Sequence, residues 1–373
     1  MSKKFNFGKM IEASGNEYVT KAGDKRGVID EWISTGSYAL NGLISGSIYK
    51  GIPNNRSVMF AGIEAVGKSL FTKFICNSAM NMKYHPVYFD TEGSVDEDTF
   101  ADLGRIKNKD YEILPVKTIE DLRVQIYKII DSYKEYYKSL TDEEYVDRDK
   151  LLMVVDSIGM LSSSANIKNL EKGEVKRDLT KQQALRELFR DITMDLNVLK
   201  IPLIPVNHVY ESIDPYSEKF KVSGGGGGRY GASAILTLAK KKARDKDKKQ
   251  VGVIITATAA KSRFVRESSK VEIYLDFNKG LNPYYGLDQF LEDEDILAKK
   301  RGKDEYFMIY KGKTENGEYP TLVGVPWKNK EVIPEILPLI DKKVQDSFSF
   351  GGSGINETED YLEDDLEDNL EGE

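Results

Sequence analysis

The stretch RSVMFAGIEAVGKSLFTKFICNSAM, residues 56–80, decides the fold class of this chain. Its first part, 56–62, is an apolar run that predicts a buried strand, and 70–80 has the apolar spacing of a helix. Between them, GIEAVGKS (62–69) matches the pattern G-x-x-x-x-G-K-[ST]. A strand, a glycine loop and a helix in this order predict a phosphate-binding loop at the carboxyl end of a strand.

Short apolar runs and helical patterns alternate on both sides of this unit. Further strands are predicted at 86–90, 111–116, 151–156 and 201–207, and helices at 118–140 and 181–199. Two apolar runs around the basic segment KKKARDKDKKQ (240–250) predict an antiparallel hairpin. The fold class is therefore α/β with a mainly parallel central sheet. Pro202 and Pro205 count against a central place for 201–207, because proline lacks the N–H that a sheet needs.

Composition indicates a soluble globular chain of one large or two moderate domains. The 373 residues are 40% hydrophobic and 31% charged, and no apolar run is long enough to cross a bilayer. The N-terminus lacks a secretory signal, and the single cysteine, Cys76, excludes an intramolecular disulfide. These features predict a cytoplasmic protein without a membrane partner.

The negative charge is concentrated at the C-terminus. Residues 357–373 hold ten acidic side chains and no basic one, so without this −10 the net charge of −7 becomes +3. A segment so acidic and so poor in apolar residues predicts a disordered tail. It either keeps the protein soluble or imitates DNA and competes for a basic groove.

Three residues give the predicted nucleotide site its chemistry. Lys68 is expected to reach the β- and γ-phosphates, and the Ser69 hydroxyl to ligate Mg²⁺. The apolar strand LLMVVD ends at Asp156, which provides the carboxylate that the metal of such a site needs. ATP and Mg²⁺ are the predicted ligands.

Two more strand ends carry polar side chains. YFDTEG places Asp90 and Glu92 after one strand, and either carboxylate can orient a water molecule for in-line attack. Asn207 and His208 follow another strand, and His208 is expected to contact the γ-phosphate. Since the carboxyl ends of parallel strands line the ligand-binding edge of an open α/β sheet, these residues should meet.

Two segments near this edge are predicted to be mobile loops that bind DNA. Glycine N–H groups approach phosphates closely and basic side chains neutralise them, although two solvated loops are the alternative. The residues concerned are Lys168, Lys172, Lys176 and Arg177 in the loop 162–179, and Gly224, Gly225, Gly226, Gly227, Gly228 and Arg229 in the loop 210–230.

In their order along the chain, these motifs resemble RecA-type recombinases. The resemblance covers roughly residues 30–290 and includes AAKSRF (259–264) and KGLNPYYG (279–286). It is nearest to the UvsX type of tailed phages, which has a histidine after the asparagine, as His208 follows Asn207 here. The resemblance implies an ATP-dependent recombinase that forms a filament on single-stranded DNA and pairs it with homologous duplex in recombination, repair and replication restart.

The resemblance also implies roles for single residues. Glu92 would activate water, His208 would sense the γ-phosphate, and Lys261 and Arg263 would reach the ATP of the adjacent subunit. Thr99 stands where the family has an adenine-stacking tyrosine, with Phe100 beside it. The implied nucleotide contacts are Gly62, Ala65, Val66, Gly67, Lys68, Ser69, Leu70, Asp96, Phe100 and Asp156.

The implied organisation is an N-terminal oligomerisation arm (1–30), a RecA-like core (31–290), a small C-terminal domain (291–345) and an acidic disordered tail (346–373). The implied partners are single-stranded DNA, double-stranded DNA, further copies of the chain in a helical filament, a single-strand-binding protein and a loader protein.

Two other functions remain open on the sequence. A hexameric helicase shares the ATPase core but normally carries a separate N-terminal domain, whereas about thirty residues precede the core here. A filament-forming or regulatory module that binds ATP without hydrolysing it is the non-enzymatic alternative, although Glu92 and Lys68 argue against it. A GTP-dependent switch is less favoured, because no N-K-x-D motif occurs.

Overall fold

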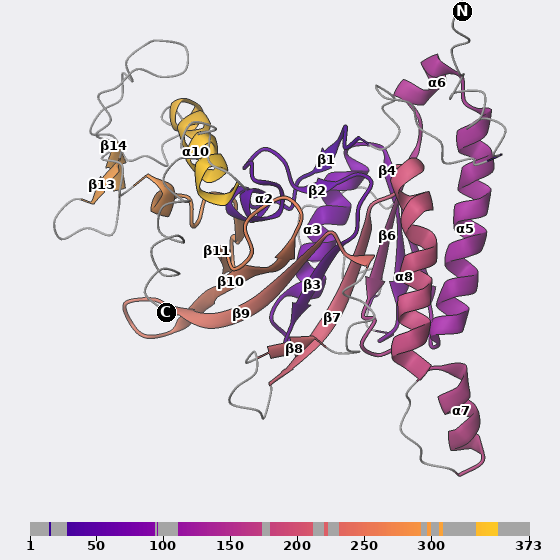
Figure 1. Ribbon diagram of the computed structural model, residues 1–373. Coiled ribbons are helices and arrows are strands. Elements are labelled where there is room, and N and C mark those ends of the chain that lie inside the picture. The colour runs from indigo at the N-terminus through magenta and orange to yellow at the C-terminus, as the bar shows by residue number, and fades with distance from the viewer. Residues whose placement is uncertain are drawn as a thin grey trace, which may run out of the picture.

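The computed structural model describes residues 15, 28–93, 95, 111–173, 180–211, 220–222, 231–291, 297–299, 306–308 and 333–349. It is a mixed α/β protein with a large, mostly parallel central sheet, as the sequence predicted (Figure 1). Within the described ranges, no helix combines the length and the apolar character that crossing a membrane requires.

The helices follow the sequence periodicity closely. They are α2 (Tyr38–Ser45), α3 (Lys68–Met80), α5 (Ile119–Ser139), α6 (Asp142–Val146), α7 (Ser164–Glu171), α8 (Thr180–Val198) and α10 (Ile333–Phe348), with a 3-10 turn, η1, at Asp288–Phe290. Helix α5 begins where the sequence predicted it, because the Thr118 hydroxyl accepts a hydrogen bond from the Asp121 amide over 3.1 Å.

The strands form one large sheet and two small pairs. They are β1 (Trp32–Ile33), β2 (Ile52–Pro53), β3 (Val58–Gly62), β4 (Tyr84–Asp90), β5 (Glu112–Pro115), β6 (Lys150–Asp156), β7 (Leu203–Glu211), β8 (Phe220–Val222), β9 (Ala234–Arg244), β10 (Gln250–Ser262), β11 (Lys270–Asp276), β12 (Gly280–Asn282), β13 (Leu297–Lys299) and β14 (Tyr306–Met308). The large sheet has the order β12-β11-β10-β9-β3-β7-β6-β4-β5, and β8 pairs with β7.

The middle of this sheet is parallel and one side is antiparallel. Strands β9, β3, β7, β6, β4 and β5 pair in parallel, whereas β9, β10, β11 and β12 are successive antiparallel neighbours. The predicted basic hairpin is confirmed as the β9–β10 connection. All parallel strands therefore end at one edge of the sheet, here called the carboxyl edge, and begin at the opposite amino edge.

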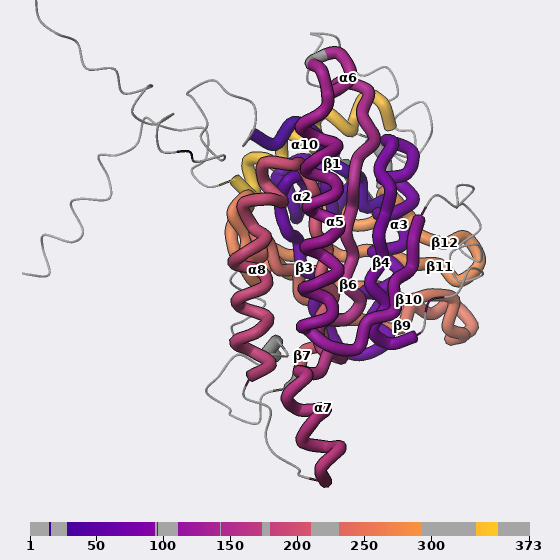
Figure 2. Tube along the Cα trace, turned by 90° about the vertical axis from the view of Figure 1, so that its right-hand side faces the viewer, coloured from indigo at the N-terminus to yellow at the C-terminus, as the bar shows by residue number. Residues whose placement is uncertain are grey.

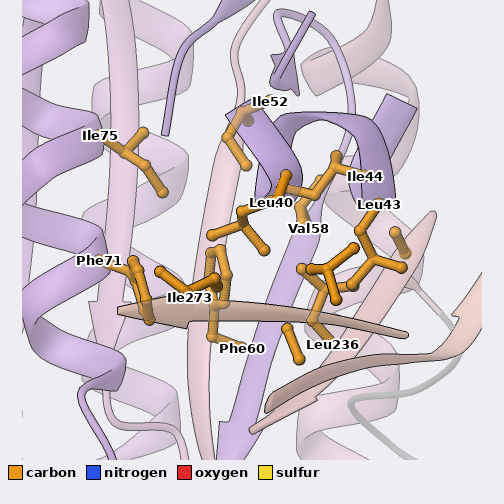
Figure 3. Packing of buried hydrophobic residues seen from close by; sticks show 14 of the residues in the cluster. Leu40, Leu43, Ile44, Ile52, Val58, Phe60, Phe71, Ile75, Leu236 and Ile273 are labelled. Atoms are coloured by element: carbon orange, nitrogen blue, oxygen red, sulfur yellow. The ribbon is translucent and has the colours of Figure 1, made fainter. Parts of the chain in front are cut away.

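Helices cover both faces of the sheet. Because side chains alternate along a strand, Val58 and Phe60 of β3 face the core under α2, α3 and α10, whereas Met59 and Ala61 face the core under α5 and α8. Figure 3 shows the first of these cores, in which Phe60 lies against Phe71 of α3 with ring centroids 6.2 Å apart. Both faces of the parallel strands are thus buried, which explains their continuous apolar sequences.

Strand β7 is central although it contains Pro205. Its pairing with β6 covers Leu203 to Pro205, and its pairing with β3 covers Val206 to His208. The proline therefore stands where the β6 pairing ends, so its missing N–H costs little. The sequence argument against this strand was wrong for that reason.

Helix α10 packs on the same core as the sheet. Its residues Ile336, Ile340 and Val344 belong to the cluster under α2 and α3, and a Cβ on Gly42 of α2 would lie 2.8 Å from Val344. The Asp341 carboxylate also accepts a hydrogen bond from the Ile48 amide over 2.7 Å. The predicted limits of a C-terminal unit, an N-terminal arm and a tail stay predictions, because most of those residues lie outside the described ranges.

The segment 162–179 is partly helical, which corrects the prediction of a loop. Helix α7 occupies Ser164–Glu171, and the Ser163 hydroxyl caps it by accepting from the Asn166 amide over 3.1 Å. The helix projects past the carboxyl edge of the sheet (Figures 1 and 2). Strand β7 also continues to Glu211, four residues past its predicted end, because β8 pairs with this extension.

Candidate active site

The loop between β3 and α3 has a shape that only its glycines allow. A Cβ on Gly62 would lie 2.7 Å from Val66 and 2.9 Å from the Leu238 carbonyl oxygen, so no side chain fits. Gly67 has φ +104°, which favours glycine, and Ala65 has a positive φ of +52°. No side chain caps the start of α3, so its first N–H groups remain to bind an anion.

Lys68 is buried at the start of α3. Its ammonium group donates hydrogen bonds to the carbonyl oxygens of Gly62 (3.0 Å) and Ile63 (2.8 Å), which folds the side chain back over the loop. Burial lowers the pKa of Lys68, and the nearby carboxylates of Asp156 and Glu92 oppose that shift. The lysine thus lies among acidic groups at the carboxyl edge.

Asp156 lies at the end of β6 and is buried beside the loop. Its carboxylate accepts hydrogen bonds from the hydroxyls of Tyr88 and Ser69, and Tyr88 also contacts Thr72 over 3.2 Å. Burial raises the pKa of Asp156, which these two hydrogen bonds and Lys68 oppose. Ser69 and Asp156, the two predicted metal ligands, are therefore neighbours.

Asp90 and Glu92 make different contacts. The strand-end pattern left either as the water-activating group, and the family resemblance implied Glu92. The Asp90 carboxylate accepts hydrogen bonds from the backbone amides of Glu92 (3.0 Å), Gly93 (2.9 Å) and Val95 (3.0 Å). It therefore holds the turn after β4 and has few lone pairs left. That turn leaves the Glu92 side chain at the carboxyl edge.

Glu92 is contacted by His208 of β7 and by Ser157, which directly follows β6. Its Oε1 accepts a hydrogen bond from the Ser157 hydroxyl over 2.9 Å and lies 3.2 Å from Nε2 of His208. Thr91 fixes the same turn, because its hydroxyl exchanges 2.8 Å hydrogen bonds with the backbone of Ser157. The predicted pair of Glu92 and His208 is thus in direct contact.

Strand register brings these residues together. Gly62 of β3 pairs with His208 of β7, and Asp90 of β4 pairs with Asp156 of β6. Asn207 is buried, and its amide oxygen accepts from the His208 backbone N–H over 2.9 Å. Lys68, Ser69, Glu92, Asp156 and His208 consequently meet at one edge.

Lys261 and Arg263 lie at the amino edge of the same sheet. Ser262 of β10 pairs with Ala234 of β9, which pairs with Val58 at the start of β3. Gly62 lies four residue steps along β3 from Val58, which is about 13 Å at 3.3 Å per step. These two basic residues are therefore not brought to the glycine loop of their own chain.

The remaining predicted residues divide between described and undescribed parts of the chain. Lys168 lies on α7, and Lys172 follows its last turn. Ala65, Val66 and Leu70 belong to the glycine loop and α3 as predicted. Outside the described residues lie Asp96, Phe100, Lys176, Arg177, Gly224, Gly225, Gly226, Gly227, Gly228 and Arg229.

Several side chains of this edge were missed on the sequence. Ser157 and Tyr88 contact Glu92 and Asp156, and Lys240 of β9 donates a hydrogen bond to the Ala65 carbonyl. Ser157 directly follows Asp156, the predicted metal ligand, which is a usable signal. Tyr88 and Lys240 carried none, because their partners are remote in sequence.

Comparison with known proteins gives one informative similarity, and no family model matches the chain. The chain is 27% identical over 282 residues to a protein of Enterobacteria phage T4 described as "Recombination and repair protein". The aligned part covers 75% of this chain and 67% of the phage protein. Over most of its length, this chain is therefore similar to a phage protein of recombination and repair.

The buried Asp156 predicts a specific pH dependence of stability. Its pKa is raised in the folded state, so the folded protein binds more protons than the unfolded chain between the two pKa values, and stability falls as the pH rises through that window. Asp156→Asn should therefore lose less stability than the wild type as the pH rises above 3.8, the ordinary pKa of an aspartate, in thermal unfolding without nucleotide.

A matched control for this measurement is Asp131→Asn, which changes an exposed aspartate on α5. Its stability should follow the wild-type pH profile. Parallel profiles for the wild type and Asp156→Asn would show that Asp156 is not the group responsible.

Proposed function

We propose that this chain is an ATP-hydrolysing DNA strand-exchange recombinase of the RecA type. The observation that carries the proposal is the meeting of Lys68, Ser69, Asp156, Glu92 and His208 at the carboxyl edge. A phosphate-binding loop, a hydroxyl–carboxylate pair and a further carboxylate beside a histidine are the groups that phosphoanhydride hydrolysis needs.

Ser69 and Asp156 suit Mg²⁺, which takes few protein ligands and keeps waters and phosphate oxygens. Bound there, Mg²⁺ would neutralise charge on the β- and γ-phosphates. Lys68 would leave the carbonyls of Gly62 and Ile63 to bind the same phosphates.

Glu92 is proposed to orient the attacking water. Its Oε1 already takes the hydrogen bonds of Ser157 and His208, and Oε2 accepts none from the described residues. Oε2 is therefore the oxygen that accepts the proton of the water. His208 lies on β7, the strand beside β3 and its glycine loop, and contacts the Glu92 carboxylate. Because His208 is proposed to contact the γ-phosphate, loss of that phosphate would alter the Glu92–His208 contact.

The substrate of the whole protein is proposed from its similarity to the phage recombination and repair protein and from its basic surfaces. Lys168 and Lys172 lie on and just after α7, the helix beyond the carboxyl edge, and the glycine run is proposed as the second DNA segment. Single-stranded and double-stranded DNA are the proposed partners. Lys261 and Arg263 are proposed to complete the site of a second copy in a filament.

The proposed role of Glu92 predicts a selective loss of turnover. Glu92→Gln keeps the side-chain volume but cannot take a proton, so ATP hydrolysis should fall by about 10²–10⁴-fold. ATP binding should survive, because the glycine loop and the Ser69–Asp156 pair are unchanged. Steady-state hydrolysis and equilibrium binding of a fluorescent ATP analogue measure the two effects. Wild-type turnover in Glu92→Gln would refute the role.

Complementation between two defective subunits tests the placement of Lys261 and Arg263. Arg263→Ala removes the amino-edge cation, and Lys68→Ala removes the phosphate-loop lysine. Each variant alone should be inactive, whereas a mixture should regain hydrolysis, because some interfaces then pair an intact loop with an intact Arg263. If the two variants assemble together and the mixture is no more active than either variant alone, the proposed role of Lys261 and Arg263 in the site of a second copy is wrong.

Strand exchange is the decisive measurement for the proposed function. With ATP, the wild-type protein should pair labelled single-stranded DNA with homologous duplex, and a heterologous duplex is the control. Unwinding of a forked duplex without homologous pairing would indicate a helicase. DNA binding and filament formation without hydrolysis would indicate the non-enzymatic module.

A further inference from the structure

The backbone of Gly159 packs against the His208 ring. A Cβ on Gly159 would lie 3.0 Å from Cδ2 of His208 and 3.3 Å from the amide oxygen of Asn207. Both distances are tighter than ordinary contacts, so the ring packs directly on the Gly159 backbone. The position of this backbone therefore limits where the Nε2 atom, 3.2 Å from Glu92, can be.

The Gly159 backbone is held from a distant helix. The Lys181 ammonium group, in the first turn of α8, donates a hydrogen bond to the Gly159 carbonyl oxygen over 2.6 Å. The preceding residue, Ile158, is tied to β7 by a 2.9 Å bond from its amide to the Val206 carbonyl. Gly159 is thus fixed between β7 on one side and α8 on the other.

The Lys181–Gly159 hydrogen bond closes the base of the segment that carries α7. The two residues are 22 positions apart, and α7 lies between them. Ser157, two residues before Gly159, donates to the same Oε1 of Glu92 that His208 contacts. A displacement of Lys181 therefore acts on both hydrogen-bond partners of Glu92.

We propose that Lys181, acting through the Gly159 backbone, is a positioning residue that sets the Glu92–His208 contact. The proposal rests on the hydrolytic role proposed for Glu92, and it adds a residue that no sequence motif contains. In this proposal Lys181 acts on the site by holding the Gly159 backbone in place. Turnover should therefore depend on it more than ATP binding does.

Histidine resonances allow a test that is independent of activity. The chain has two histidines, His208 at the site and His85 on β4, so the second is an internal reference. Lys181→Met removes the donor and keeps the length of the side chain. It should shift the Cε1–H signal of His208 and leave that of His85 unchanged in the apoprotein. Gly159→Ala, whose Cβ displaces the ring, should shift the same signal.

Kinetics provide the second readout. Lys181→Met should lower kcat for ATP by about tenfold and change KM less than about twofold, because orientation rather than binding is lost. Lys181→Arg keeps a donor and should restore most of both the turnover and the His208 signal. Gln183→Met, an exposed change in the same turn of α8, is the control and should behave as the wild type.

Two outcomes overturn the proposal. One is an unchanged His208 signal in Lys181→Met, whether or not Gly159→Ala shifts it. The other is an equal shift in Gln183→Met, which would reflect a general disturbance of α8. If the wild-type protein hydrolyses no ATP, the proposed function fails, but the resonance comparison still decides whether Lys181 positions His208.

Discussion

The parallel pairing of β3, β7, β6 and β4 is the constraint on which the rest of this protein depends. Their register sets Gly62 opposite His208 and Asp90 opposite Asp156, so four strand ends share one edge. A slip by one residue would turn every side chain to the other face of the sheet, because the side-chain period is two. The two cores, under α2, α3 and α10 and under α5 and α8, oppose such a slip on both faces.

Burial at this edge makes the charged groups depend on one another. Lys68 and Asp156 are both removed from water, which disfavours both charges, and each is the counter-ion that limits the shift of the other. Hydroxyls of Tyr88 and Ser69 offset part of the cost for Asp156. The proposed binding of ATP together with Mg²⁺ would bring an anion to Lys68 and a cation to Asp156.

The proposed catalytic residues lie at two opposite edges of the sheet. The glycine loop, the Ser69–Asp156 pair and Glu92 lie at the carboxyl edge, whereas Lys261 and Arg263 lie at the amino edge. Arg56, also at the amino edge, has its pKa lowered by burial and by Arg263, so basic groups gather there. Head-to-tail contact between copies would bring basic groups to an edge that holds carboxylates.

The sequence by itself determined the α/β class, the glycine loop with Lys68 and Ser69, and Asp156 at a strand end. The spacing of apolar residues, the glycines of a loop and helix-capping residues such as Thr118 each act within a few residues. The sequence pattern therefore predicts the elements that depend on them. Only the tertiary structure showed that Asp90 holds the turn after β4 while Glu92 contacts His208, and that Ser157 lies against Glu92 and Gly159 against His208. It also placed Pro205 where β6 pairing ends and made part of 162–179 helical. The reason is distance along the chain: Glu92 meets Ser157 and His208 across 65 and 116 residues, and no local pattern records such contacts.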